Sequence, residues 1–190
     1  MKEIIGIAAV ILSFVAYAPY FRDIFARKAK PHPYSWFVWG LTSILIFALQ
    51  ISHGGGAGAY TTASVAFISF AVCLLAYRND GIKDITTTDT AMLIMALIAT
   101  ALWLFAKQPT LSMILLIAAD MCGFAPSIRR AWYNPYGETA TMWGTNAMRH
   151  TLSIFALQKY SLLTLLNPVV WAIGNFCFTL MLIFRRQTKL

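Results

Sequence analysis

Seven long apolar segments, separated by short polar connections, account for most of this chain. They cover residues 4–25, 35–52, 57–77, 90–106, 111–128, 139–157 and 162–184. A helix needs roughly 20 mainly apolar residues to cross the hydrocarbon core of a bilayer, and these segments are close to that length. The pattern therefore predicts an all-α integral membrane protein with seven transmembrane helices.

The composition supports this class and excludes an ordinary soluble domain. The chain is 59% hydrophobic and 12% charged, whereas a soluble domain has about 25% charged residues. Its net charge of +8 does not indicate nucleic-acid binding, because the basic residues lie at the ends of apolar segments, where they set membrane topology. We expect a lipid bilayer as the partner surface and the bacterial inner (plasma) membrane as the location.

The distribution of positive charge predicts the orientation. If the N-terminus lies outside, eleven Lys and Arg residues fall on the inner side and three on the outer side. The outer residues are Lys2, Lys107 and Lys159, and the inner ones are Arg22, Arg27, Lys28, Lys30, Arg78, Lys83, Arg129, Arg130, Arg185, Arg186 and Lys189. Positive charge concentrates on the cytoplasmic side of membrane proteins, so we expect an outer N-terminus and a cytoplasmic C-terminus.

An internal repeat divides the seven segments into three groups. The sequence YAPYFR at 17–22 parallels FAPSIR at 124–129, and two further pairs keep the same order: Trp39-Gly40 with Trp143-Gly144, and Tyr77-Arg78 with Phe184-Arg185. The expected organisation (3+1+3) is a first three-helix bundle (residues 1–83), a linker helix (84–107) and a second three-helix bundle (108–190). Because the linker is a single span, the two bundles run in the same direction, as parallel repeats.

Pro19 and Pro126 occupy equivalent positions of the repeat. A proline inside a helix removes one backbone hydrogen bond and clashes with the preceding turn, so both helices are expected to kink. Paired kinks in paired repeats favour hinges of a gate near the cytoplasmic side. The alternative is that membrane helices simply tolerate these prolines.

Three ionisable residues lie deep within apolar segments, far from the segment ends: Asp120, Arg149 and His150. Ionisable groups are costly inside a membrane, and they are functional candidates for that reason. Counted from the outer ends of their segments, Asp120 and Arg149 both lie ~13 Å deep, close to the bilayer midplane. The repeat aligns Asp120 with Ser13, so only the second half carries this charge. One face of the sixth segment combines Arg149 and His150 with Asn146 and Trp143.

An ion pair between Asp120 and Arg149 is expected, because either charge alone would be expensive in the membrane. Three interpretations of the pair are open: a static salt bridge, a proton site at Asp120, or a site where a solute carboxylate competes with Asp120 for Arg149. His150 is either a proton relay or a hydrogen-bonded core histidine.

Two proline motifs recur with similar neighbours in both halves. Ala18-Pro19-Tyr20 is followed by Ser35-Trp36 and Trp39, and Ala125-Pro126-Ser127 is followed by Thr139 and Trp143. In these motifs and in its layout the whole chain resembles the PQ-loop/SWEET superfamily of small seven-helix transporters. It departs from that family where Tyr20 and Ser127 replace the glutamine after each proline. The resemblance implies two three-helix bundles around a central solute site that opens alternately to each side.

The resemblance also implies where a solute would bind. In the sugar-transporting members, asparagines on the third and seventh helices and nearby tryptophans contact the solute. The seventh segment here offers Asn167, Trp171 and Asn175, which share one helix face, whereas the third segment (57–77) has no asparagine. Structural roles are open for both asparagines, Asn167 as a cap before Pro168 and Asn175 in an interhelical hydrogen bond.

The remaining aromatic and histidine residues receive structural interpretations. Aromatic residues gather near the expected cytoplasmic interface, where they are typical membrane anchors: Tyr34, Trp36, Trp132, Tyr133 and Tyr136. His32 and His53 lie near connections and are expected to be incidental.

These observations predict a transporter of a small polar solute, an amino-acid-like zwitterion or a sugar, that works by alternating access. Proton coupling through Asp120 and His150 is an open option, and the alternative function is a non-transporting receptor or interaction protein. An enzyme, a metal site and a cofactor are not expected, since no nucleophile–base pair or metal-binding spacing is visible; a homo-oligomer is compatible with the sequence. The candidate solute-binding residues are Ser13, Trp39, Asp120, Trp143, Asn146, Arg149, His150, Asn167, Trp171 and Asn175.

Overall fold

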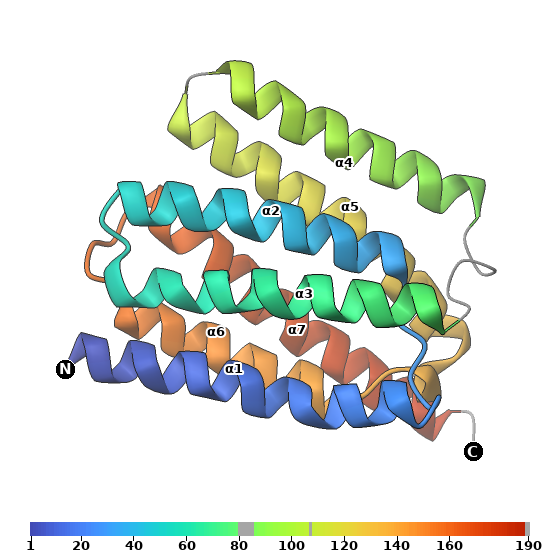
Figure 1. The fold of residues 1–190 in the computed structure, drawn as a ribbon. Coiled ribbons are helices and arrows are strands. Elements are labelled where there is room, and N and C mark those ends of the chain that lie inside the picture. Colours follow the sequence, from blue (N-terminus) through green and yellow to red (C-terminus); the bar gives the residue numbers. More distant parts are fainter. Residues whose placement is uncertain (80–85, 107, 189–190) are drawn as a thin grey trace.

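The computed structural model describes residues 1–79, 86–106 and 108–188, and over these ranges it is helical without strands. The helices within them are α1 (Lys2–Phe25), α2 (Pro33–Ser52), η1 (Gly56–Ala59), α3 (Tyr60–Arg78), α4 (Thr87–Ala106), α5 (Pro109–Tyr133), η3 (Pro135–Gly137), α6 (Ala140–Ala156) and α7 (Leu162–Gln187). The α-helices lie side by side in one bundle, with the two termini at opposite ends (Figure 1).

Each of the seven apolar segments is an α-helix, as predicted. Five stretches of the described chain are long and apolar enough to cross a membrane: α1, α2, η1 with α3, α5 and α7. The remaining two helices, α4 and α6, are outside this set, and α6 has 17 residues. The largest difference from the predicted boundaries is at α5, which continues past residue 128 to Tyr133. Arginine favours helix, so Arg129 and Arg130 extend α5 beyond its apolar run.

Local sequence signals explain where several helices begin. Pro33 and Pro109 stand at the first position of α2 and α5, where a missing backbone N–H costs nothing. At the start of α7, Ser161 and Thr164 form a reciprocal capping box, in which each side chain bonds the other residue's backbone. The short connections are therefore encoded by helix-start residues.

Helix packing follows the same pattern in the two halves. In the first half α3 contacts both α1 and α2, and in the second half α7 contacts both α5 and α6. The halves meet where α1 contacts α6 and where α2 contacts α5. Helix α4 packs mainly against α5, on the flank of the bundle (Figure 1).

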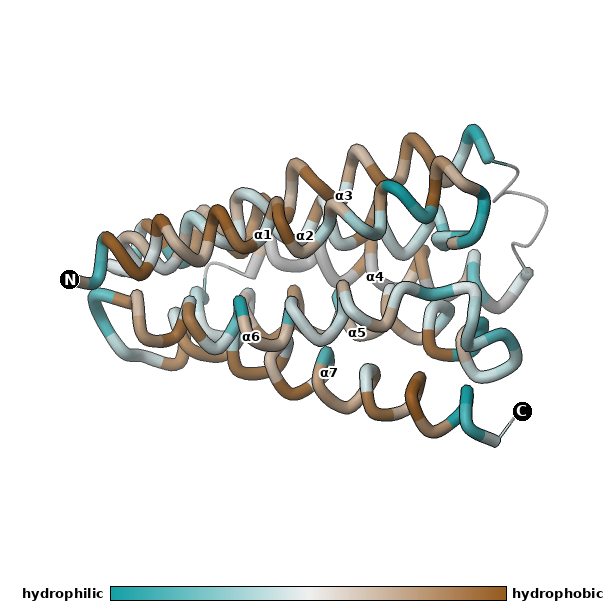
Figure 2. Tube along the Cα trace, turned by 90° about the horizontal axis from the view of Figure 1, so that it is seen from below, coloured by the Kyte–Doolittle hydropathy of each residue, from teal (hydrophilic) through white to brown (hydrophobic). Residues whose placement is uncertain are grey.

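Apolar side chains cover the outside of the bundle. More than half of the side-chain surface is exposed at Ile4, Ile7, Phe67, Phe105 and Met148. Figure 2 shows hydrophobic positions along the helices and hydrophilic positions concentrated near their ends. A soluble bundle would show the opposite pattern, with its apolar side chains turned inward. The arrangement therefore indicates a membrane protein.

We call the end of the bundle that holds the C-terminus the basic end. Among the described residues it carries Arg22, Arg27, Lys28, Lys30, Arg78, Arg129, Arg130, Arg185 and Arg186, whereas Lys2 and Lys159 lie at the other end. The predicted positions of Lys83, Lys107 and Lys189 lie outside the described residues. Arg185 donates to the carbonyl of Trp132 at 3.1 Å and Arg186 to that of Pro135 at 3.1 Å. These bonds hold α7 to the connection between α5 and α6.

His32 has a structural role that contradicts the expectation that it is incidental. Its Nδ1 accepts a hydrogen bond from the backbone N–H of Ser35 at the start of α2 (3.3 Å), and its Nε2 lies 3.4 Å from Asp89. Burial lowers the pKa of the His32 imidazole to about 4, so a neutral ring faces this carboxylate. Asp89 also accepts from Thr86 and Arg129. The cluster fastens the start of α4 to α2 and α5.

The other end, which we call the glycine end, has close helix contacts at glycines. A Cβ atom added to Gly6 would lie 2.6 Å from the Cβ of Ala57, and one added to Gly58 would lie 2.8 Å from the carbonyl oxygen of Ser153. The Ser153 hydroxyl donates to the carbonyl of Gly58 at 3.0 Å. Only hydrogen fits at these positions, so α1 and α6 pack directly on η1 and its neighbours.

We expect Gly58→Ala to destabilise the protein by about 1–3 kcal/mol, because its methyl group would overlap the backbone of α6. The measurement is the thermal unfolding midpoint in detergent. Gly144→Ala is the matched control, since a Cβ there would meet nothing closer than 3.5 Å and alanine favours helix. Equal midpoints for the two variants would contradict the close contact at Gly58.

Candidate functional site

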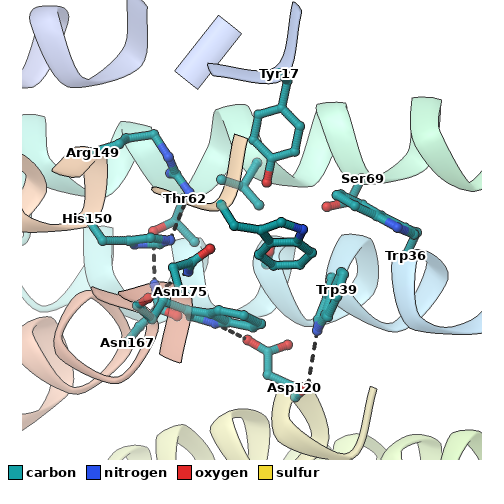
Figure 3. A pocket seen from close by; sticks show the side chains of 14 residues that line it. Tyr17, Trp36, Trp39, Thr62, Ser69, Asp120, Arg149, His150, Asn167 and Asn175 are labelled. Atoms are coloured by element: carbon teal, nitrogen blue, oxygen red, sulfur yellow. Dashed lines mark hydrogen bonds between the residues drawn. The ribbon is translucent and has the colours of Figure 1, made fainter. Parts of the chain in front are cut away.

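A buried pocket lies inside the bundle, with walls from six helices (Figure 3). Its volume open to the centres of water molecules is about 30 Å³. One water needs about 10–15 Å³ on this measure, so the pocket has room for little more than water and must widen to admit an organic solute. The lining residues are Tyr17, Trp36, Trp39, Ser43, Thr62, Val65, Ser69, Asp120, Trp143, Arg149, His150, Asn167, Trp171 and Asn175.

Asp120, on α5, is the centre of hydrogen bonding on one wall. Its carboxylate accepts from Trp171 Nε1 on α7 at 2.9 Å and from the Thr42 hydroxyl on α2. Its backbone carbonyl accepts from Trp39 Nε1 on α2 at 3.0 Å. Gly123 permits this approach, because a Cβ there would already lie 3.2 Å from a side chain of α2. Asp120 thus joins α2 of the first half to α5 and α7 of the second.

Arg149, on α6, forms a second polar wall and is 1% exposed. Its Nε donates to Asn146 Oδ1 at 3.0 Å, and its Nη2 lies 2.8 Å from His150 Nε2. A guanidinium has no acceptor, so His150 Nε2 must accept and the imidazole is neutral with its proton on Nδ1. The remaining nitrogen of Arg149, Nη1, is buried without a hydrogen-bond partner. This buried cation has unused donors beside the pocket.

The expected ion pair between Asp120 and Arg149 is not present. Asp120 is held by neutral donors, and Arg149 by Asn146 and His150. Figure 3 shows the two charged groups on different sides of the pocket. The reason is helix order: α7 lies between α5 and α6 and contacts both. The equal membrane depth of Asp120 and Arg149, counted along their segments, contains no information about this separation.

The two asparagines of α7 have defined partners. Asn167 lies inside α7, so its interpretation as a cap is wrong; its Nδ2 donates to the Thr62 hydroxyl on α3 at 3.3 Å. Thr62 in turn donates to Gln50 Oε1 on α2 at 2.8 Å. Asn175 Nδ2 donates to the carbonyl of Trp171 in its own helix at 2.6 Å, rather than between helices. Asn167 therefore links the halves, and Asn175 stays local.

Most of the predicted binding residues line the pocket: Trp39, Asp120, Trp143, Arg149, His150, Asn167, Trp171 and Asn175. Two do not. Asn146 lies behind Arg149 as its hydrogen-bond partner, and Ser13 is buried with its hydroxyl on the carbonyl of Ala9. Further lining residues were not among the predicted binding residues: Tyr17, Trp36, Ser43, Thr62, Val65 and Ser69. Thr62, Val65 and Ser69 are three and four residues apart and share one face of α3, which is the signal that could have indicated them.

Trp36 was expected to be a membrane anchor, but it is a core residue that is 2% exposed. It belongs to an aromatic layer, which we define as Trp36, Trp39, Phe124, Trp143, Trp171 and Phe178. Successive rings are in contact, with centroids 5.0 Å apart for Trp36 and Trp39 and 4.6 Å apart for Trp143 and Phe178. The layer fills the bundle from the pocket toward the basic end. Trp132, Tyr133 and Tyr136 are exposed, in keeping with the anchor interpretation.

Glu138, in the connection before α6, lies behind this layer and was not predicted as a site residue. Its Oε2 accepts a hydrogen bond from Trp143 Nε1 at 3.2 Å. Burial raises the pKa of the Glu138 carboxyl to about 7, although the bond from Trp143 and the charges of Arg130 and Arg186 oppose the rise. A titrating carboxyl thus holds one wall residue of the pocket.

No model of a known protein family matches this chain, and neither a curated protein nor a solved structure matches it. The resemblance to the PQ-loop/SWEET superfamily therefore rests on the sequence motifs alone. Function has to be argued from the geometry of the pocket.

Thr42→Val should destabilise the protein by about 1–3 kcal/mol, because the variant keeps the side-chain shape but leaves the buried Asp120 carboxylate with one donor fewer. Thermal unfolding in detergent measures the effect. Thr145→Val is the control, since that hydroxyl bonds only within its own helix at the bundle surface. If Thr42→Val unfolds no earlier than Thr145→Val, the bond to Asp120 does not contribute.

Glu138→Gln should alter the pH dependence of stability. A carboxyl whose pKa rises from 4.5 to about 7 on folding makes the native protein less stable as pH rises between these values. Glutamine cannot ionise and can still accept from Trp143. The free energy of unfolding of the variant should therefore be higher than that of the unaltered protein near pH 8, by no more than about 3 kcal/mol. The difference should vanish near pH 4.5. The measurement is the thermal unfolding midpoint across this pH range, with Glu3→Gln as an exposed control. If the midpoints of Glu138→Gln and the unaltered protein depend on pH in the same way, the raised pKa is refuted.

Proposed function

We propose that this protein is a seven-span carrier that moves a small polar solute across the membrane by alternating access. The observation that carries the proposal is the buried pocket with a carboxylate, a guanidinium and an imidazole in its walls. Ionisable side chains inside a membrane bundle mark solute and ion pathways, because a purely structural bundle gains nothing from their cost.

The matching contacts of the two halves support a 3+1+3 layout, in which α1–α3 and α5–α7 are parallel triplets and α4 links them. Every helix of both triplets contributes to the pocket, and no described side chain of α4 does. Sites between repeats near the midplane are typical of transporters built from internal repeats. Positive charge at the basic end supports an outer N-terminus and a cytoplasmic C-terminus.

Alternating access requires the triplets to move against each other. Their contacts run between α1 and α6 and between α2 and α5, and the small pocket volume requires such a movement before an organic solute enters. Pro19 and Pro126 lie inside the two helices, α1 and α5, that make these contacts. They are the proposed hinges, because a proline weakens the helix at one point.

Asp120 is the proposed coupling residue. Its hydrogen bonds span the boundary between the triplets, from Thr42 and Trp39 on α2 to Trp171 on α7. A proton on the oxygen that accepts from Trp171 would place a donor opposite the indole N–H, which cannot accept a hydrogen bond. Protonation would therefore loosen this junction, and proton uptake would be linked to the movement of the triplets. His150 joins the pocket as a neutral acceptor of Arg149.

The test is uptake of radiolabelled neutral amino acids and glucose into proteoliposomes, with and without an imposed pH gradient. At least one solute should accumulate, and the gradient should increase its uptake several-fold. Asp120→Asn should lose this stimulation, because the amide cannot take up a proton. Asp23→Asn at the basic end is the control. Full stimulation in Asp120→Asn excludes the coupling role, and tight binding without any flux would favour the receptor alternative.

A further inference from the structure

The pocket presents two opposite charges on separate walls. Arg149 belongs to α6 and Asp120 to α5, and both side chains are buried at 1% exposure. Neither forms an ion pair with a described residue. Burying an unpaired ion is costly, and the cost is recovered only when a counter-ion or sufficient hydrogen bonds are supplied. Each wall therefore offers a place for a charge of the opposite sign.

Arg149 has donors left for an anion. A guanidinium carries five N–H groups; Nε serves Asn146, Nη2 serves His150, and Nη1 has no partner. Nη1 and Nη2 form the forked edge that matches the two oxygens of a carboxylate. An uncharged hydroxyl would accept only one such bond and leave the positive charge uncompensated.

Asp120 has acceptor capacity left for a cation. Each carboxylate oxygen accepts one bond, from Thr42 or from Trp171, and a carboxylate offers about four lone-pair positions. An ammonium group supplies three donors and the missing positive charge. The Trp171 indole lies between the two walls, with its Nε1 on Asp120 and its ring stacked on His150 at 6.3 Å between centroids.

We propose that the solute is a small zwitterion whose carboxylate binds Arg149 and whose ammonium group binds Asp120. The inference rests on the proposed function, since it names the solute class of that site. A zwitterion compensates both walls while adding no net charge to a closed pocket, which keeps the cost of burial low. A sugar would leave both ions unpaired.

The experiment measures binding to the purified full chain in detergent by intrinsic fluorescence, because several indoles line the pocket. The probes are the neutral amino acids, with glucose as the uncharged reference. The best-bound amino acid is then compared with its methyl ester, which lacks the negative charge, and its N-acetyl derivative, which lacks the positive charge. Both derivatives should bind at least tenfold more weakly. Binding of glucose alone, equal binding of either derivative, or no binding by any probe would overturn the proposal.

Two variants assign each charge of the solute to its wall. Arg149→Gln should bind the amino acid and its methyl ester equally, and Asp120→Asn should bind the amino acid and its N-acetyl derivative equally. Arg149→Gln should still bind the N-acetyl derivative more weakly than the amino acid, and Asp120→Asn should still bind the methyl ester more weakly. The opposite pattern in the two variants would overturn the assignment. Arg22→Gln, at an exposed arginine, is the control. If Arg149→Gln does not fold, the derivative series on the unaltered chain decides the question.

Failure of this inference is distinguishable from failure of the carrier proposal. Glucose flux into proteoliposomes without amino-acid binding would keep the carrier and reject the zwitterion. The expected derivative series without any flux would keep the zwitterion site and reject the carrier. Thermal midpoints measured with each probe provide a second readout, because a ligand stabilises the folded state that it binds.

Discussion

The cost of burying polar groups among apolar helices is the constraint on which the rest of this structure depends. A polar group buried there is expensive unless a hydrogen-bond partner lies close by, because bulk water does not reach it. Asp120 meets this requirement with neutral donors from α2 and α7, and the Gln50–Thr62–Asn167 chain does so with amides and a hydroxyl. Such bonds cross between helices, so satisfying the polar groups also fixes the order of the helices.

The charged groups of the pocket are confined to one half of the repeat. Ser13 stands where the second half has Asp120, and its hydroxyl bonds within its own helix. The first half contributes two neutral donors, Thr42 and Trp39 on α2, which form hydrogen bonds to Asp120 in the second half. The two halves thus share a packing scheme, while the ions lie in the second half and the first half contributes neutral donors to Asp120.

Helix positions could be predicted from the sequence, and eight of the ten candidate residues line the pocket, because hydropathy and rare intramembrane charges are local signals. The Asp120–Arg149 pair was wrong because depth along a helix says nothing about which helix lies between two others. Trp36 was misassigned because its distance from the helix end resembles that of an interfacial anchor, while packing against Trp39 decides its burial. Glu138 was missed because only tertiary structure places it under Trp143.

The glycine contacts have a consequence for any opening of the pocket toward the glycine end. Gly58 meets the main chain of α6 at Ser153, so no long side chain stands between the halves at this point. A barrier of long side chains can open by changing rotamers one at a time. A barrier made of main chain has no rotamers, so it opens only when whole helices separate, and a partial leak past it is disfavoured.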